Sequence, residues 1–439
     1  MKMFFTEIDS VIKMCGYQNK QENQNYRRSK HCVSLPCEEG ELLYHTFTGA
    51  LVLIPTDEDV TDNREELIKH WFLVPHDFDE CRVSDDVRRV LRLLNHTSNK
   101  IHCFTVLTTT DCNARCFYCY ELGIRRFHMT KETAQDIANH IIKASGGEPV
   151  TIKWFGGEPL YNTEVIDLIC DCLRDNKIIF ESEMTTNGFY FDEQVAHKAV
   201  RKWHLKKTQI TLDGTETVYN RTKAYIDSVA SPFQKVIDNI ETALHEGIAI
   251  NIRLNMDASN REDLLLLVDL LAQRFGDGTN LKIYVSLLHE LKNKIHGFVN
   301  DAEALDAFFE LTEHIDRYGL LRKEKLQRKL RLNHCMADNS DCEVIMPDGR
   351  ICRCEHIDQE HIVGSIHSDE RDEGIMQKWK ERYYTEVCPN CTLYPMCTDL
   401  RECPENKDGC TMVQREIRMR ALANQIIEAY NTVEKEEVL

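Results

Sequence analysis

The cysteines are the residues whose type and spacing point most directly to chemistry. The chain of 439 residues has 19 of them, and Cys112, Cys116 and Cys119 follow the spacing Cys-X3-Cys-X2-Cys within TTTDCNARCFYCYELG. Such a triad can ligate three irons of a four-iron (4Fe-4S) cluster and leave the fourth iron open to another ligand. Three cysteines with a remote histidine would also satisfy zinc, so a zinc knuckle is the alternative.

A second set of cysteines lies near the end of the chain. It reads Cys335-X13-Gly349-X4-Cys354, then Cys388-X2-Cys391-X5-Cys397-X5-Cys403, and finally Cys410, with Cys342 inside the first gap. Eight cysteines can ligate two four-iron clusters. Zinc ribbons are again the alternative. Cys352 lies two residues before Cys354 and could compete with it for the same iron.

Composition narrows the class of protein. Hydrophobic residues make up 42% and charged residues 29%, which is typical of a folded globular chain. The net charge of -18 opposes binding to a phosphate backbone, so we expect no nucleic-acid partner. Without an apolar run near the ~20 residues that cross a bilayer, and without a secretory signal at the N-terminus, we expect no membrane association. We therefore expect a cytoplasmic protein whose cysteines stay reduced.

The middle of the chain alternates short apolar strands with amphipathic helices, as βα units do. Such units form a parallel sheet that gathers ligands at the C-terminal ends of its strands. The six strands are predicted at residues 104–110, 150–155, 179–186, 209–212, 249–255 and 281–287.

Four segments are predicted from these patterns. Residues 1–100 form a small α+β module with a hairpin over 42–54, residues 101–322 a partial barrel of six βα units, residues 323–334 a linker, and residues 335–439 a cysteine-rich domain. The fold class is therefore α/β.

The triad Cys112-X3-Cys116-X-Tyr118-Cys119 after the first strand resembles the signature of the radical S-adenosylmethionine (SAM) superfamily. The resemblance implies a partial (β/α)6 barrel similar to a TIM barrel. It also implies that a cluster held by the triad binds SAM and cleaves it to a 5′-deoxyadenosyl radical.

Further motifs at strand ends match the same family. The resemblance implies that Gly156, Gly157, Glu158 and Pro159 receive the SAM amino group, and that Thr186-Asn187-Gly188 and Leu212-Asp213-Gly214 line the ribose and methionine. For the SAM carboxylate three partners stay open. They are Lys223, Arg221 and Arg253.

The second cysteine set resembles the SPASM extension of radical SAM proteins, with X5 in place of the usual X3 before Cys403. The resemblance implies two auxiliary clusters and three four-iron clusters in all. Auxiliary cluster I would be held by Cys335, Cys342, Cys354 and Cys403. Auxiliary cluster II would be held by Cys388, Cys391, Cys397 and Cys410.

The hairpin of the N-terminal module is similar to the winged-helix leader-binding region of ribosomal-peptide maturases. We expect the hairpin over 42–54 to offer a sheet edge to which a leader peptide adds as a strand; the alternative is that residues 1–100 only cap the barrel. The resemblance implies an enzyme that takes a hydrogen from a leader-bearing precursor peptide and forms a thioether or carbon–carbon cross-link, with flavodoxin or ferredoxin as electron donor. Glu355 is the predicted base, with His356 or a substrate thiolate as alternatives. Two other functions stay open: a sulfatase maturase that forms formylglycine, and an iron–sulfur scaffold or electron carrier without SAM chemistry.

Overall fold

The computed structural model describes most of the chain. The described residues are 2–3, 12–13, 15–17, 25–57, 63–95, 100–276, 280–288, 297–327, 330–356, 361–404 and 410–437. The fold divides into two compact units, the first formed by Met1–Ser98, Glu324–His334 and Glu381–Leu439, and the second by Asn99–Lys323 and Cys335–Lys380. The segment 335–439, predicted as one domain, therefore contributes to both units. Residues 328 and 329 of the predicted linker lie outside the described part.

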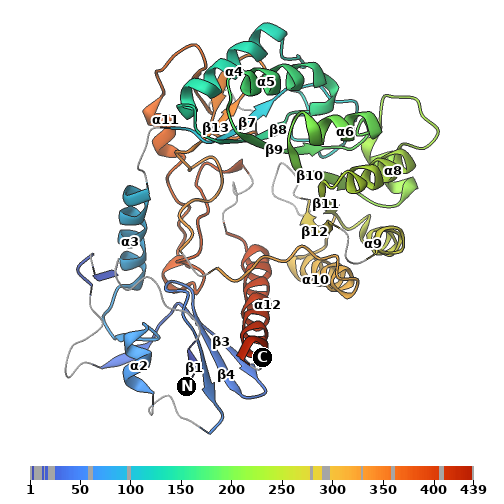
Figure 1. Cartoon of the computed structure of the whole chain (residues 1–439). Helices are drawn as coiled ribbons and strands as arrows, with labels where there is room; N and C mark the ends of the chain where they lie inside the picture. The colour runs from blue at the N-terminus through green and yellow to red at the C-terminus, as the bar shows by residue number, and fades with distance from the viewer. Residues whose placement is uncertain are drawn as a thin grey trace. The chain divides into compact units, whose positions relative to one another are not determined.

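The second unit is built on a sheet of nine strands (Figure 1). Six parallel strands, paired in chain order, confirm the predicted partial barrel: β7 (Cys103–Leu107), β8 (Val150–Phe155), β9 (Phe180–Thr186), β10 (Leu205–Leu212), β11 (Ala249–Met256) and β12 (Leu281–Leu287). Beyond β7 the sheet continues with β13 (Cys342–Ile345), β14 (Arg350–Cys352) and β15 (Ile362–Ser365). This extension was not predicted, because β13 pairs in parallel with a strand more than 200 positions earlier.

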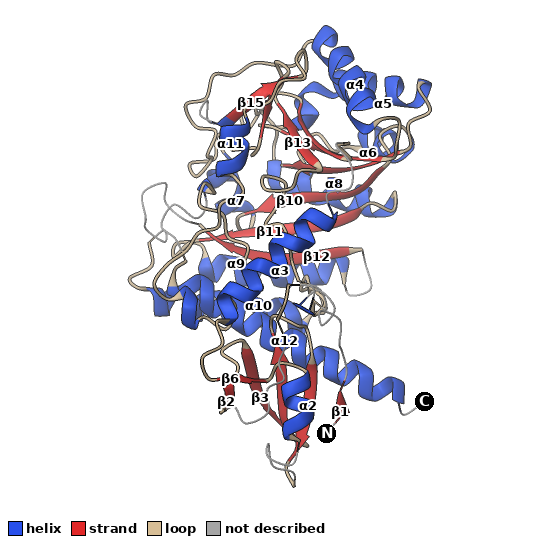
Figure 2. Ribbon diagram, turned by 90° about the vertical axis from the view of Figure 1, so that its left-hand side faces the viewer, coloured by secondary structure: helices blue, strands red, loops and turns tan. Residues whose placement is uncertain are grey.

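The helices between these strands follow the outer side of the curved sheet (Figures 1 and 2). They are α4 (Lys131–Ser145), α5 (Thr163–Asp175), α6 (Glu193–Arg201), α7 (Glu216–Lys223), α8 (Pro232–His245), α9 (Arg261–Phe275) and α10 (Asp301–Arg317), with the short helix η1 (Pro159–Asn162). A further short helix, α11 (Glu373–Lys378), follows β15.

Capping residues determine where these helices begin and end. Thr130 accepts the Thr133 backbone N–H at the start of α4, and Gly146 ends that helix at φ +61°. At α8, Ser231 caps the helix and Pro232 occupies its first position.

The two faces of the sheet differ in chemistry. On β8, Val150, Ile152 and Trp154 are buried, whereas the alternate residues are only partly buried. On that alternate face the register places Lys153 beside Glu183, and Glu183 beside Lys207. The inner face of the barrel is therefore lined by charged side chains, which suits a polar substrate better than a closed core.

The first unit is built on a four-stranded antiparallel sheet in the order β1-β5-β4-β3. Its strands are β1 (Lys2–Met3), β3 (Cys32–Cys37), β4 (Gly40–His45) and β5 (Leu51–Pro55), and β2 (Tyr26–Arg28) pairs separately with β6 (Leu73–Pro75). The unit also contains α2 (Arg64–Lys69), α3 (Glu80–Asn95), η3 (Cys388–Asn390) and α12 (Met412–Glu437). Strands β4 and β5 form the predicted hairpin, which turns at Gly49 with φ +72°.

Both faces of this sheet are covered by helices. Leu42 and Leu53 pack with Leu422 and Ile426 of α12, and the opposite face packs on Leu67 of α2. The N-terminal module and the end of the chain thus share one core.

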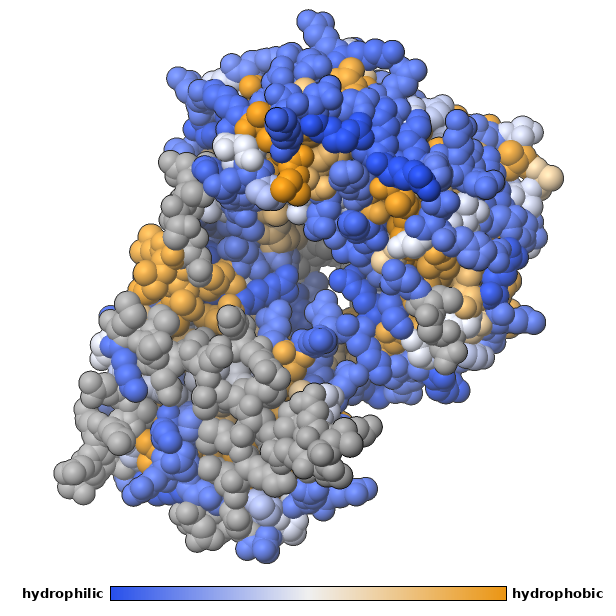
Figure 3. Space-filling model, in the orientation of Figure 1, coloured by the Kyte–Doolittle hydropathy of each residue, from blue (hydrophilic) through white to orange (hydrophobic). Residues whose placement is uncertain are grey.

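Hydrophilic residues cover most of the face seen in Figure 3. Among the described residues, no helix combines the length and apolar character needed to span a membrane.

Candidate active site

The loop that follows β7 places three thiols at the C-terminal edge of the parallel sheet. The Cys112 sulfur accepts the Ala114 backbone N–H at 3.3 Å and the Asn187 amide at 3.7 Å. The Cys119 backbone N–H donates to the Cys116 carbonyl at 3.2 Å, which closes a turn. Burial raises the pKa of Cys112 to about 12 and that of Cys119 to about 11. Metal binding at Cys112 and Cys119 must therefore displace their protons.

This loop fits a four-iron cluster. In such a cluster each cysteine binds a different iron, so the thiols need not converge on one point. Within the described ranges, no three His, Cys, Asp or Glu side chains surround one point as a single metal ion requires. The three cysteines are all partly accessible, which leaves room for the inorganic part of a cluster and a further ligand.

The glycine pair after β8 lets this strand end touch the cysteine loop. A Cβ on Gly156, whose φ is +121°, would lie 2.2 Å from the Thr109 carbonyl oxygen. A Cβ on Gly157 would lie 2.4 Å from the Asp111 carbonyl oxygen and 3.1 Å from Glu121 Oε2. The Gly157 N–H also donates to the Thr109 carbonyl at 3.1 Å. Only glycine fits between the strand and the loop here.

We expect Gly157→Ala to displace the cysteine loop, because the new Cβ would collide with the backbone carbonyl of Asp111, which cannot rotate away as a side chain could. A shift of about 1 Å at a catalytic centre costs roughly a hundredfold in rate, so SAM-dependent turnover should fall by about that factor. The measurement is turnover together with iron content after anaerobic reconstitution. Gly147→Ala is the control for backbone strain without a clash, because Gly147 has φ +81° and a Cβ there would meet nothing within 4 Å. If the Gly157→Ala variant turned over at the wild-type rate, the result would contradict this account.

Glu158 ties three strand ends together. Its side chain is fully buried, and its carboxylate accepts hydrogen bonds from Leu160 N–H (3.1 Å), Thr186 Oγ1 (2.6 Å) and Asn187 N–H (2.7 Å). Burial raises its pKa to about 7. The Asn187 amide also donates to Asn113 of the cysteine loop at 2.8 Å. Glu158 and Asn187 therefore hold the motifs after β8 and β9 against the sulfur loop, and their contacts with SAM stay a prediction.

The buried pair Asp213 and Lys223 changes one expectation from the sequence. The Lys223 ammonium lies 3.0 Å from the Asp213 carboxylate, with the side chains 4% and 1% exposed. The Tyr118 hydroxyl donates to Asp213 at 2.8 Å and accepts from Lys223 at 3.0 Å. Burial alone would lower the pKa of Lys223, but the Asp213 charge and Tyr118 raise it well above its usual value. This network argues against Lys223 as the partner of the SAM carboxylate.

The two arginine candidates remain accessible to a ligand. Arg221 lines a cavity of about 200 Å³ together with Phe117 and Tyr118. Arg253, on the inner face of β11, donates to Ser286 Oγ at 2.9 Å, while its Nε is buried without a hydrogen-bond partner. An orphaned buried N–H of this kind is the group that an incoming carboxylate satisfies.

Glu355 lies on the loop after β14, on the side of the barrel interior. Its carboxylate is 3.6 Å from the Lys153 ammonium of β8. The next residue, His356, stacks on Tyr120 with ring centroids 4.1 Å apart. Because Tyr120 follows Cys119 directly, this stack joins the triad loop to the loop that carries Cys354.

Glu121 was missed in the sequence, although a carboxylate two residues after the triad was a usable signal. Its Oε1 is buried without a hydrogen-bond partner, and burial raises its pKa to about 8. It faces the Gly157 backbone, so it belongs to the same centre.

Three cysteines predicted for auxiliary cluster I lie in the second unit, close to a buried arginine. Arg353 donates to four backbone carbonyls, those of Met336, Ala337, Asn339 and Cys342. Its charge also acts on the thiols of Cys335 and Cys342. Cys342 on β13 is registered beside Cys103 on β7, and their thiols form a hydrogen bond. Cys352, two residues before Cys354, packs against Leu107 and Val344.

The cysteines predicted for auxiliary cluster II all lie in the first unit. The Cys391 N–H donates to the Cys388 carbonyl at 3.1 Å, and the Cys388 sulfur accepts the Thr385 N–H at 3.2 Å. Arg418 of α12 acts electrostatically on both Cys397 and Cys410. A cationic side chain beside two thiolates suits an anionic cluster. Cys403 belongs to this unit too, and its predicted place in auxiliary cluster I stays a prediction.

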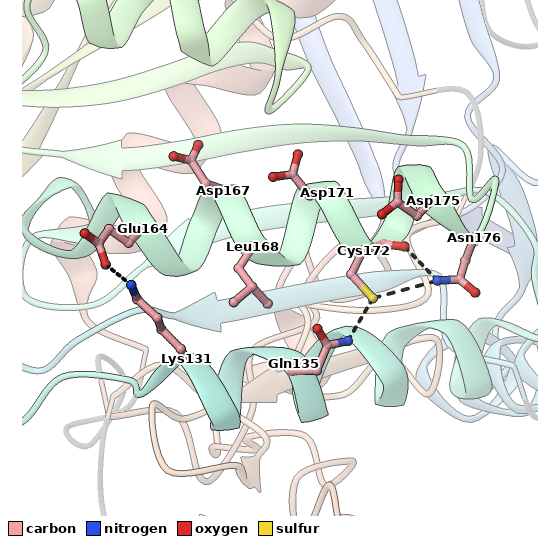
Figure 4. Close-up of a pocket in the computed structure, with 9 residues that line it drawn as sticks. All are labelled: Lys131, Gln135, Glu164, Asp167, Leu168, Asp171, Cys172, Asp175 and Asn176. Carbon is pink, nitrogen blue, oxygen red and sulfur yellow. Dashed lines mark hydrogen bonds and ion pairs between the residues drawn. The ribbon is translucent and has the colours of Figure 1, made fainter.

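Another cavity lies away from the candidate site, between α4 and α5 (Figure 4). Its volume is about 520 Å³, and it is lined by residues of α4 and α5 such as Gln135, Asp167 and Cys172. The Gln135 amide donates to the Cys172 sulfur at 3.1 Å. None of the predicted site residues lines it, so the cavity belongs to the outer helical layer.

Comparison with protein families agrees with this geometry. Residues 106–271 match the model described as the radical SAM superfamily. The chain contains a radical SAM domain. This superfamily is an enzyme class, and it implies SAM and a four-iron cluster.

Curated relatives of the radical SAM domain have different activities. The chain is 25% identical over 265 residues to a GTP 3′,8-cyclase of Clostridium perfringens, covering 56% of this chain and 78% of the relative. It is 23% identical over 223 residues to the radical SAM cyclopropyl synthase TigE of Paramaledivibacter caminithermalis, covering 46% and 45%. The chain thus spans less than half the length of TigE.

Solved structures share the fold over more of the chain. The protein anSMEcpe, solved with AdoMet and a Cp18Cys peptide, superposes with TM-score 0.56 at 14% identity, covering 75% of this chain and 99% of that one. Streptococcus suis SuiB, solved with its precursor peptide SuiA, gives TM-score 0.52 at 13% identity, covering 85% and 95%.

Proposed function

We propose that the chain is a radical SAM maturase that removes two hydrogens from a ribosomally made precursor peptide and forms a thioether or carbon–carbon cross-link. The observation that most supports this proposal is that the cysteine triad, the glycine pair, Glu158 and Asn187 contact one another at one edge of the sheet. In the radical SAM family, a reduced cluster held by such a triad supplies the 5′-deoxyadenosyl radical from SAM. Every other step depends on what the surrounding residues bind and orient.

The SAM methionine moiety would lie over the glycine pair, with its carboxylate toward Arg253. The orphaned Nε of Arg253 offers a buried donor at the C-terminal end of β11. Arg221 in its adjoining cavity is the second candidate. Arginine suits this role better than lysine because its planar fork binds a carboxylate with two parallel hydrogen bonds.

The peptide would enter along the charged inner face of the barrel. Lys153, Glu183 and Lys207 follow one another in register across three strands, and Tyr284 donates to Gln209 at 2.7 Å on the same face. Polar side chains at these positions can hydrogen-bond a peptide backbone. The fold neighbours anSMEcpe and SuiB were solved with bound peptides, which supports a peptide substrate for this chain.

Removal of two hydrogens also needs an acceptor for one electron and one proton. The first hydrogen atom leaves with the nucleoside radical as 5′-deoxyadenosine. When the new bond forms, the remaining electron would pass to an auxiliary cluster and the proton to a base. Glu355 is the candidate base, because it follows Cys354 in the chain and its carboxylate lies 3.6 Å from the Lys153 ammonium.

The leader peptide would bind at the edge of the first unit's sheet. The predicted hairpin cannot provide that edge, because β4 lies between β3 and β5, and β5 between β4 and β1. In the described part of this sheet, β3 pairs with β4 alone. The Thr46 N–H donates to the His31 carbonyl, so the alternation of antiparallel pairing turns the N–H and C=O of Ser34 outward. An added peptide strand can pair with these groups.

Two other functions remain as alternatives. A sulfatase maturase would use the same SAM site on a cysteine or serine of a folded protein's motif. A scaffold or electron carrier would use only the iron–sulfur centres.

The experiment is co-expression of the chain with short peptides encoded beside it in its genome, followed by mass spectrometry. A loss of two hydrogens, localised to a new cross-link, is the expected result. If no leader-bearing peptide changes mass but a peptide with a sulfatase motif gains formylglycine, the sulfatase maturase replaces the proposal.

A further inference from the structure

His31 is a fully buried histidine that the candidate active site does not use. It follows the turn before β3, and its side chain is 0% exposed. Neither ring nitrogen makes a hydrogen bond of normal geometry. Leaving a buried polar group unsatisfied costs about 1–3 kcal/mol, so such a group usually faces a ligand, an ion or a water.

The surroundings of His31 are the loop that carries Cys388, Cys391 and Cys397. The Cys391 backbone lies within reach of the ring. The ring is nearly parallel to that of Tyr394, with centroids 6.3 Å apart. His31 therefore stands against the inner turn of this cysteine loop.

The N-terminal module holds this loop through hydrogen bonds from its side chains. Thr46 Oγ1 donates to the Thr392 carbonyl at 2.6 Å and also contacts the His31 carbonyl at 3.1 Å. The Lys30 ammonium donates to Asn390 Oδ1 at 3.0 Å. Residues 30–31 thus run alongside residues 390–392, which fixes where the imidazole lies.

The imidazole of His31 carries at least one N–H donor in either of its ordinary protonation states. Cluster sulfurs accept hydrogen bonds, and those bonds set the reduction potential of the cluster.

We propose that His31 donates a hydrogen bond from its ring N–H to a sulfur of the cluster held by Cys388, Cys391, Cys397 and Cys410, and so tunes the reduction potential of that cluster. His31 is then a positioning and tuning residue contributed by the N-terminal module. The inference rests on the proposed function, because it requires these cysteines to hold a cluster.

The direction of the effect follows from charge. Reduction adds one negative charge to the cluster, so a donor aimed at its sulfur stabilises the reduced form more than the oxidised form. Loss of the donor should therefore shift one auxiliary reduction potential to a more negative value. The potentials of the other two clusters should not move, and they serve as internal references.

The test compares His31→Phe, which removes both ring nitrogens, with His31→Asn and His31→Gln, which keep an N–H near the position of one ring nitrogen or the other. Potentials are read from redox titrations followed by electron paramagnetic resonance. We expect a negative shift for His31→Phe at unchanged iron content, and partial recovery in one of the two amide variants. Tyr394→Phe is the matched control, since it keeps the neighbouring ring and removes only the distal hydroxyl, which donates to Asp85.

A second measurement uses only the wild-type protein, so it does not depend on the folding of a variant. In wild-type protein with ¹⁵N-labelled histidine, electron–nuclear double resonance on the reduced cluster should detect a weak histidine nitrogen coupling. Absence of that coupling, or unchanged potentials in folded His31→Phe, would overturn the proposal. Loss of one cluster's iron in His31→Phe and in both amide variants would overturn it too, because His31 would then be an iron ligand. If wild-type protein holds only one cluster, the auxiliary sites of the proposed function have failed instead.

Discussion

Replacing Lys223 by methionine should lower the free energy of unfolding by about 3–5 kcal/mol, because it leaves the Asp213 carboxylate buried without its partner. The two side chains are 4% and 1% exposed and lie 3.0 Å apart, so water cannot replace the lost ammonium. Tyr118 would keep one hydrogen bond to Asp213, which is too little to balance a buried charge. The measurement is urea unfolding of the metal-free protein.

The control for Lys223→Met is Lys207→Met. Lys207 pairs with Glu183 at 2.7 Å, but both side chains are about two-fifths exposed. An exposed pair contributes about 0–1 kcal/mol. The double variant Asp213→Leu/Lys223→Met should recover much of the lost stability, since it removes both charges. Equal stability of Lys223→Met and wild type would show that this pair is not a structural element of the site.

Replacing Cys397 by alanine should separate SAM cleavage from peptide oxidation. The triad loop and the glycine pair belong to the second unit, whereas Cys397 belongs to the first. Loss of one ligand of auxiliary cluster II should therefore remove about one cluster's iron, leave 5′-deoxyadenosine formation in place, and abolish the two-hydrogen loss from the peptide.

Cys352→Ala is the matched control for this cysteine variant. The Cys352 side chain is buried and packs against Leu107, Val344 and Met346. We expect full iron loading and full turnover. A Cys397→Ala protein that retains all its iron would contradict the ligand assignment.

The barrel strands were predictable because each is short, apolar and followed by a helical pattern. The six observed strands lie where the alternation placed them, although β10 begins at Leu205, earlier than predicted. Leu205 is buried but Lys206 and Lys207 are accessible, and the pairing with β9 shifts register between Leu205 and Lys207, so the two lysines concealed the strand in an apolar search. Strands β13 to β15 were not predictable, because parallel pairing of β13 with β7 leaves no local signal.

The candidate site was only partly readable from the sequence. Sequence motifs identified the cysteine loop and the glycine pair, because the chemistry of both depends on residue type and spacing. The choice among Lys223, Arg221 and Arg253 stayed open in the sequence, because the burial of Lys223 against Asp213 depends on packing that one sequence does not reveal. The role proposed for His31 could not be predicted either, because the cysteine loop beside its unpaired ring lies more than 300 positions later in the chain.

The most direct test of the central claim is anaerobic SAM cleavage. The chain is reconstituted with iron and sulfide, reduced, mixed with SAM, and assayed for 5′-deoxyadenosine beside a Cys112→Ala/Cys116→Ala/Cys119→Ala variant. The account predicts that the wild type forms 5′-deoxyadenosine and that the triple variant forms none while it keeps the iron of the auxiliary sites. Formation of none by a fully loaded wild type would contradict the account and favour an iron–sulfur scaffold or electron carrier.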